Sequence, residues 1–285
     1  MSKKELLKGI IPPMITPLNE NAEIDIESTK KVVDYLIEGG VHTLFILGTT
    51  GEGPLISPVE QVKLANIVVE YSDGRVPVIA GVSDVSTIKV LKNIKKLSKT
   101  GLDGYVSTLP FYDKTNLEEE INHFEILAAE SELPIIIYDI PVKVGQRLSE
   151  KALENLVDID NIIGLKDSSS NLRNFRERIE KFSHKRNFLF ALGHSDMIDI
   201  SIYLGAEGVV PSDAHLFPEL CVQIYNSAQK RDWTKARELQ AKLNKKRIEL
   251  YDKYPVKNRA NNKVCKNHLK KEGIISSDYV MAPYL

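Results

Sequence analysis

Residues 161–171 read Asn-Ile-Ile-Gly-Leu-Lys-Asp-Ser-Ser-Ser-Asn, so one lysine ends a short apolar run. Residues 161–165 have the length and the branched side chains of a buried strand, and the residues from Asn171 onward have the pattern of a helix. Lys166 is therefore predicted at the C-terminal tip of a strand. A lysine among apolar neighbours loses hydration of its ammonium group, which lowers its pKa and allows the amine to form a Schiff base with a ketone. The alternative is an ordinary surface lysine at a strand end.

The same order of strand and helix repeats along the chain. Eight strand-like apolar runs, each followed by a helical stretch, begin at Gly9, His42, Val76, Gly104, Pro134, Asn161, Asn187 and Gly208. Alternating strands and helices pair in parallel through right-handed crossovers, and eight such units predict an α/β protein with a closed TIM (β/α)8 barrel. An open doubly wound sheet is the alternative, but no G-x-G-x-x-G pattern follows the first run. We expect the barrel in residues 1–228 and a C-terminal helical extension, packed on the barrel, in residues 229–285.

The composition is ordinary for a globular protein. Of the 285 residues, 42% are hydrophobic and 27% are charged, and the formal net charge is -1. This balance gives no overall field toward nucleic acid or an anionic membrane, and no segment approaches the ~20 apolar residues of a membrane helix. Cys221 and Cys265 fit neither a metal site nor a disulfide framework, as expected in a reducing cytoplasm. We predict a cytoplasmic protein without nucleic-acid or membrane partners.

The extension is locally basic. Trp233, Leu239, Leu243 and Leu250 give it an apolar face, and lysines and arginines dominate residues 242–271. A solvated helical face explains such a run, and a site for a polyanion is the alternative.

Polar residues follow several of the predicted strands, where the active site of a TIM barrel lies. The second strand leads into Gly-Thr-Thr-Gly-Glu, whose backbone N–H groups and Thr49 and Thr50 hydroxyls could converge on a carboxylate. Tyr138 ends the very apolar fifth strand, and His194 and His215 follow the seventh and eighth. Each also has a structural explanation. Thr49 and Thr50 would be ordinary turn residues, Tyr138 would be a core residue with a hydrogen-bonded hydroxyl, and the two histidines would hydrogen-bond within their loops.

Three of these pieces occur in a specific order. Gly-Thr-Thr-Gly-Glu at residues 48–52, Tyr138 with Pro141 and Gly145, and Gly-Leu-Lys-Asp at residues 164–167 lie on the second, fifth and sixth strands. The combination resembles the dihydrodipicolinate synthase/N-acetylneuraminate lyase family of pyruvate-dependent class I aldolases, from about residue 9 to about residue 283. The resemblance implies a homotetramer, a dimer of dimers, that uses pyruvate and an aldehyde. No metal or other cofactor is expected, because the imine polarises the substrate as a cation would.

The resemblance also implies roles for single residues. Lys166 would form the imine with pyruvate, and Tyr138 would shuttle protons during imine formation and carbon–carbon bond chemistry. Thr49 and Thr50 would hold the pyruvate carboxylate. Tyr112 would enter the site of a neighbouring subunit and complete a proton relay with Thr50. Positions that line the pyruvate end of the site are matched by Gly193 and Val210, the latter through its backbone carbonyl.

Departures from the family pattern bear on the second substrate. Lys143 stands where the synthase branch usually has an arginine that grips the carboxylate of aspartate semialdehyde, and lysine lacks the planar fork for that contact. Polar groups that could hydrogen-bond a polyol tail are Asp139, Lys143, Ser168, Ser169, His194 and Ser195. We therefore expect reversible cleavage of a 2-keto-3-deoxy sugar acid, such as 2-keto-3-deoxygluconate, to pyruvate and an aldehyde. The alternatives are dihydrodipicolinate synthase, a 2-keto-3-deoxy acid dehydratase, and a non-catalytic homologue that binds a carboxylate.

Overall fold

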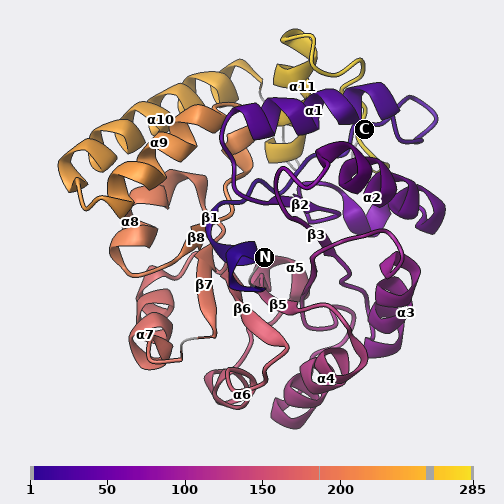
Figure 1. Ribbon diagram of the computed structural model, residues 1–285, viewed down its shortest axis with the longest axis vertical. Helices are drawn as coiled ribbons and strands as arrows, with labels where there is room; N and C mark the ends of the chain where they lie inside the picture. Colours follow the sequence, from indigo (N-terminus) through magenta and orange to yellow (C-terminus); the bar gives the residue numbers. More distant parts are fainter. Residues whose placement is uncertain (1–2, 186, 255–259, 284–285) are drawn as a thin grey trace.

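Parallel strands form the centre of the molecule, and helices surround them (Figure 1). The computed structural model describes residues 3–185, 187–254 and 260–283. Over these residues the strands are β1 (Gly9–Ile10), β2 (Leu44–Ile46), β3 (Val78–Gly81), β4 (Gly104–Ser107), β5 (Ile135–Asp139), β6 (Ile162–Asp167), β7 (Leu189–Leu192) and β8 (Gly208–Val209). They pair in the order β1-β8-β7-β6-β5-β4-β3-β2. A parallel bridge between Pro13 and Phe45 joins the segment after β1 to β2, so the ring closes and the predicted TIM barrel is confirmed.

Helices follow the strands in the predicted alternation. They are α1 (Ile26–Glu38), α2 (Pro58–Ser72), α3 (Thr87–Leu97), α4 (Leu117–Glu130), α5 (Pro141–Val144), α6 (Glu150–Leu156), α7 (Leu172–Phe182), α8 (Ile198–Tyr203), α9 (Pro218–Gln229), α10 (Trp233–Lys253) and α11 (Ala260–Lys271). Short 3-10 turns occupy Lys3–Leu7, Gly53–Leu55, Ser195–Met197 and Ser212–His215. Several helices begin where the sequence supplies a cap: the side chains of Asp25, Ser57, Asn116 and Ser149 each accept a hydrogen bond from the backbone N–H three residues on.

The extension follows α9 as two helices. In Figure 1, α10 runs alongside α9, and α11 is the yellow helix near the top of the view; it contacts the Ser212–His215 turn. Residues 255–259 and 284–285 of the extension lie outside the described residues, and these include the basic Lys257 and Arg259. Among the described helices, none is long and apolar enough to cross a membrane.

The barrel interior is where the strands bring distant residues together. Successive side chains of a strand point alternately inward and outward, so β5 and β6 each direct every second residue into the barrel. Tyr138 pairs with Lys166 in register, and the next residues, Asp139 and Asp167, pair in turn. Strand β6 therefore continues two residues beyond the predicted end at Leu165.

Candidate active site

The Lys166 amine lies inside the barrel between two aromatic rings. Its Nζ atom is 3.9 Å from the ring centroid of Tyr138 on β5 and 4.9 Å from the ring centroid of Phe45 on β2. Strands β2 and β6 lie on opposite sides of the closed sheet, so the contact with Phe45 shows that the lysine stem reaches across the interior. Only 5% of Lys166 and 7% of Tyr138 is exposed. The surface alternative for Lys166 is therefore wrong.

This environment shifts the pKa of both side chains. Burial lowers the pKa of Lys166, and the neighbouring Tyr138 only partly opposes the shift. Burial alone would raise the pKa of Tyr138, but Lys166 and hydrogen bonds with Ser168 and Thr49 outweigh it, so the pKa falls below its ordinary value. An amine that loses its proton more readily is a better nucleophile at neutral pH, and a phenol of lowered pKa is a better proton donor.

Ser168 reaches Tyr138 because a glycine leaves room for it. A Cβ atom on Gly193 would lie 2.0 Å from Ser168 Oγ, so any larger residue there would displace the serine. The Gly193 N–H donates to the Asp167 carbonyl at 2.7 Å, and the Ser168 N–H donates to the Asp139 carbonyl at 2.8 Å. The ends of β5, β6 and β7 are thus tied together around the two catalytic candidates. Val210 is buried directly after β8, and its N–H donates to the Leu192 carbonyl at 2.8 Å.

The loop of residues 48–53 brings Thr49 to Tyr138. Thr49 and Thr50 are half-buried, and the Thr49 hydroxyl is hydrogen-bonded to the Tyr138 hydroxyl. The turn requires glycine at residue 53, where a Cβ would lie 1.9 Å from the Leu47 carbonyl oxygen. Glu52 has a left-handed backbone (φ 58°), which turns its side chain away from solvent into the protein.

Glu52 forms a buried ion pair with the extension. Lys266 of α11 places Nζ 2.6 Å from Glu52 Oε1, and both side chains are fully buried. The other carboxylate oxygen accepts the Met281 N–H at 2.7 Å, and Lys266 also donates to the Tyr279 carbonyl at 2.7 Å. The C-terminal segment therefore holds the loop that carries Thr49 and Thr50. The expectation of a solvated basic face is wrong for Lys266.

Comparisons with known proteins show the family of this chain. The model of the dihydrodipicolinate synthetase family matches residues 6–285. The chain belongs to this family. Members of the dihydrodipicolinate synthetase family are lyases, and this chain is a pyruvate-dependent class I aldolase of that family.

Relatives in the family share about a third of the sequence or less. The 4-hydroxy-tetrahydrodipicolinate synthase of Oceanobacillus iheyensis is 32% identical over 207 residues, which is 73% of this chain and 70% of that protein. The dihydrodipicolinate synthase of Bacteroides thetaiotaomicron superposes with a TM-score of 0.91 at 32% identity, covering 98% of this chain and 93% of the other. YagE of Escherichia coli K12, solved in complex with pyruvate, gives 0.89 at 26% identity with coverages of 98% and 92%. A variant described as the first monomeric dihydrodipicolinate synthase gives 0.89 at 27% identity, with coverages of 100% and 93%.

The other residues predicted for the active site lie at its solvent-exposed edge or away from it. Tyr112, in the loop after β4, is 83% exposed. Lys143 is exposed on α5, a short helix that the sequence patterns do not predict. His194 is half-exposed, with Nε2 3.2 Å from Ser170 Oγ. His215 is buried: its Nε2 accepts the Ile15 N–H at 3.0 Å and its Nδ1 donates to the Ser212 carbonyl at 2.7 Å, so it is a neutral core histidine with a pKa lowered by burial to about 4.

Three of the groups expected to face a polyol tail are hydrogen-bonded or ion-paired to other parts of the protein instead. The Asp139 carboxylate is on the outer face of β5, where Arg178 of α7 contacts it at 2.7 Å. The Ser195 hydroxyl accepts the Asp213 N–H at 3.1 Å. Ser169 also turns outward, since Arg147 donates to its hydroxyl at 3.3 Å. Sequence reasoning missed Arg178, although two aspartates that directly follow paired strand residues signal the need for a buried cation.

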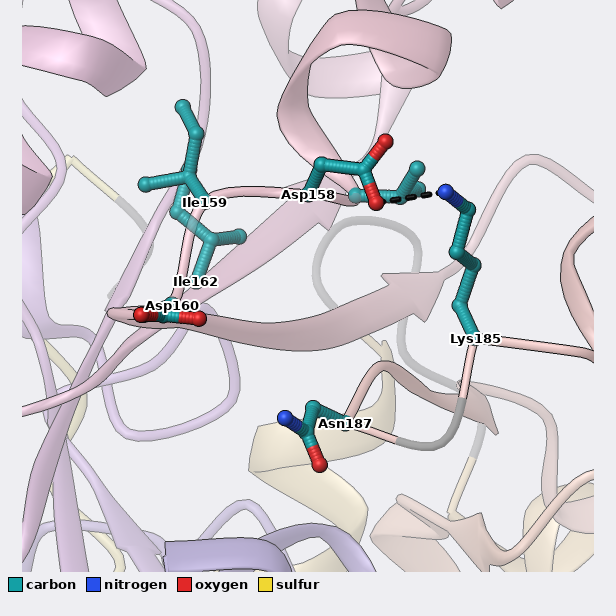
Figure 2. Close-up of a pocket in the computed structure, with 7 residues that line it drawn as sticks. Asp158, Ile159, Asp160, Ile162, Lys185 and Asn187 are labelled. Atoms are coloured by element: carbon teal, nitrogen blue, oxygen red, sulfur yellow. Dashed lines mark hydrogen bonds and ion pairs between the residues drawn. The ribbon is translucent and has the colours of Figure 1, made fainter.

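A cavity of about 140 Å³ lies at the other end of the barrel (Figure 2). Residues that line it precede β6 and β7: Val157, Asp158, Ile159, Asp160, Lys185 and Asn187, with Ile162 from the start of β6. In Figure 2 the Asp158 carboxylate and the Lys185 ammonium face each other across its edge, and they form an ion pair at 2.5 Å. Lys166 lies at the opposite, C-terminal end of β6, so this cavity is separate from the candidate active site.

Proposed function

We propose that Lys166 is the Schiff-base lysine of this aldolase and that Tyr138 carries the protons. The observation that supports this most is the buried Lys166 amine held 3.9 Å from the Tyr138 ring centroid at the C-terminal end of the barrel. The neutral amine attacks the ketone of the 2-oxo acid, which is pyruvate in condensation and the sugar acid in cleavage, and the ketone oxygen leaves as water. The protonated imine then withdraws electrons from the adjacent carbon. In the cleavage direction, Tyr138 takes the proton of the substrate hydroxyl as the carbon–carbon bond breaks. The enamine that results is protonated and hydrolysed to pyruvate.

Thr49 and Thr50 would hold the pyruvate carboxylate in this scheme. Their loop lies next to Tyr138, and fixed N–H and hydroxyl donors would direct the carboxylate away from the amine and the ketone toward it. Gly193 and Val210 would complete the pyruvate end of the site. Tyr112 would act in the site of a second subunit, which its 83% exposure in the single chain allows. We therefore propose a homotetramer, although one structural relative is described as a monomeric variant.

For the second substrate we propose a 2-keto-3-deoxy sugar acid, cleaved to pyruvate and an aldehyde. Lys143 is an exposed ammonium on α5, which can bind a hydroxyl or a single carboxylate oxygen but not both oxygens of a carboxylate. Ser168 and His194 would add further hydrogen bonds at the rim. The second candidate is 4-hydroxy-tetrahydrodipicolinate synthase, in which the same enamine attacks aspartate semialdehyde. The names of the relatives favour this candidate.

Reductive trapping tests the imine. We expect incubation with pyruvate and borohydride to inactivate the protein and to add one reduced pyruvate group per chain. Peptide mapping by mass spectrometry should locate that group on Lys166, because burial favours its neutral amine. Lys114 and Lys143, which are exposed, serve as internal controls in the same digest. Adduct formation elsewhere, or none, would remove Lys166 from the proposed role.

Replacing Lys143 tests the second substrate. Lys143→Ala is expected to raise the KM for the second substrate about tenfold, the effect of losing one hydrogen bond to a charged group, and to leave pyruvate trapping unchanged. Two reactions are measured: the release of pyruvate from 2-keto-3-deoxygluconate, and the condensation of pyruvate with aspartate semialdehyde. Lys151→Ala, an exposed lysine on α6, is the matched control. Condensation without any release from the sugar acid would select the synthase, and a loss of trapping would show that Lys143 acts at the pyruvate end.

A further inference from the structure

Two carboxylates lie directly behind the proposed catalytic pair. Asp139 follows Tyr138 on β5, Asp167 follows Lys166 on β6, and the two aspartates are paired in register. Because side chains alternate along a strand, the aspartates point toward the helices while Tyr138 and Lys166 point into the barrel. Both carboxylates are about 1% exposed. Two adjacent buried negative charges are very unfavourable unless a cation compensates them.

Arg178 of α7 supplies that cation. Its Nη1 atom lies 2.7 Å from Asp139 Oδ2 and 3.2 Å from Asp167 Oδ2, so one guanidinium nitrogen bridges the two strands. The guanidinium is fully buried, and it also donates to Glu150 Oε1 at 2.8 Å and to the Leu148 carbonyl at 2.7 Å. All three guanidinium nitrogens thus donate hydrogen bonds that hold the ends of β5 and β6 against α6 and α7.

The remaining carboxylate oxygens fix the loops that leave these strands. Asp139 Oδ1 accepts the Leu148 N–H at 3.2 Å, and Asp167 Oδ1 accepts the Ser169 N–H at 2.7 Å. Ser169 is the neighbour of Ser168, which contacts Tyr138. A rotation of either aspartate would therefore move the backbone that carries Lys166, Tyr138 and Ser168.

Charged side chains gather on the outer face of β5 and β6, behind Tyr138 and Lys166. On the outer side, Arg178 and the more distant Arg147, whose Nη2 is 3.7 Å from Asp139 and 3.9 Å from Asp167, face the two aspartates and Glu150. On the inner side, the amine faces the rings of Tyr138 and Phe45, and it is also hydrogen-bonded to the titratable Tyr138 hydroxyl. The two aspartates are the charged residues that directly follow Tyr138 and Lys166 on the paired strands.

We propose that Arg178 is a positioning residue for the Lys166–Tyr138 pair and that it acts through Asp139 and Asp167. This inference rests on the proposed Schiff-base chemistry. Arg178 holds the two strand ends in register, and its charge cancels the negative field that the aspartates would otherwise exert on the Lys166 amine. Without that charge, the field favours the ammonium form of Lys166, so the neutral nucleophile exists only at higher pH.

The test is the pH dependence of imine trapping with pyruvate and borohydride. Arg178→Met is expected to move the acid midpoint of the trapping rate upward by about one pH unit, which is about tenfold slower trapping on the acid side. Asp139→Asn removes one negative charge with the shape unchanged, so it is expected to move the midpoint downward. Arg176→Met, on the same helix but in an exposed ion pair with Glu180, should leave the midpoint unchanged. Arg178→Lys keeps the charge without the fork, and it should restore the midpoint while lowering the maximal rate.

Opposite shifts from the two variants would not arise from a loss of folding. Circular dichroism of each variant gives the folded fraction, and rates are expressed per folded chain. If Arg178→Met does not fold, the downward shift of Asp139→Asn still decides the question. Wild-type midpoints in folded variants would overturn the role of Arg178. Failure of wild-type protein to trap pyruvate would instead overturn the proposed function.

Discussion

Tyr138→Phe is expected to slow turnover by about 10²–10⁴-fold, the usual contribution of a positioned general acid and base. The substitution removes the hydroxyl that contacts Thr49 and Ser168, while the ring that covers the Lys166 amine remains. Pyruvate trapping should persist at a reduced rate, because the amine stays buried. The kcat value should fall more than the KM changes, since the hydroxyl acts on protons in the transition state rather than in substrate binding.

A second buried tyrosine provides the control for this prediction. Tyr105 on β4 is buried, and within the described residues its hydroxyl has a long contact of 3.5 Å to the Ile94 carbonyl. Tyr105→Phe removes a hydroxyl from the same barrel without touching the site, so turnover should remain near the wild-type value. Steady-state kinetics on both variants at one pH separates a chemical role from a packing role. A decrease of only a few-fold for Tyr138→Phe would exclude it as the proton carrier.

Much of the fold follows from local signals in the sequence. The sequence predicts helices over residues 26–38 and 117–130, and α1 (Ile26–Glu38) and α4 (Leu117–Glu130) have these bounds, because a capping side chain precedes an amphipathic run in each. The first apolar run, residues 9–16, is broken by Pro12 and Pro13, and only Gly9–Ile10 of it forms a regular strand. Pro12 and Pro13 have no N–H to donate, so the apolar run continues while the regular ladder does not.

Strand β6 departs from its apolar run in the opposite direction. The charged residues Lys166 and Asp167 indicate a strand end when only the sequence is considered. In the structure they extend the ladder, because Lys166 faces aromatic rings and Asp167 faces Arg178, eleven residues further on. The local pattern of apolar and polar residues does not show which side chains of other strands and helices will contact these residues. The division of the chain into a barrel and an extension at residue 228 also stays a prediction. Contacts across this boundary, such as the ion pair between Lys266 of the extension and Glu52 of a barrel loop, cannot be read from local periodicity.

The candidate site was predictable to the extent that it depends on strand ends. In a TIM barrel the tip of each strand faces the same end of the ring, so Lys166, Tyr138 and Thr49 could be placed together without contacts. The buried pair of Glu52 and Lys266 could not, because 214 residues separate the partners. Lys266 also belongs to a run of basic residues in which nothing local distinguishes a buried lysine from a solvated one.

Lys266→Met is expected to destabilise the protein by about 3–5 kcal/mol, because Glu52 would remain buried without its cation. The free energy of unfolding, measured by urea denaturation, reports this loss. Lys270→Met is the matched control on α11: its ion pair with Asp278 is half exposed, so its loss should leave the free energy of unfolding close to the wild-type value. Adding Glu52→Gln to Lys266→Met removes the orphaned charge and should recover part of the stability.

The same variant links the extension to the site. Glu52 also accepts the Met281 N–H, so loss of Lys266 loosens the loop that presents Thr49 and Thr50. The concentration of pyruvate that half-saturates trapping should therefore rise in Lys266→Met at a temperature where the variant is still folded, whereas Lys270→Met should match wild type. Equal stability losses in the two lysine variants would mean that Glu52 finds another partner or takes up a proton. Unchanged pyruvate saturation in the folded Lys266→Met protein would show that the C-terminal segment stabilises the barrel without positioning its carboxylate-binding loop.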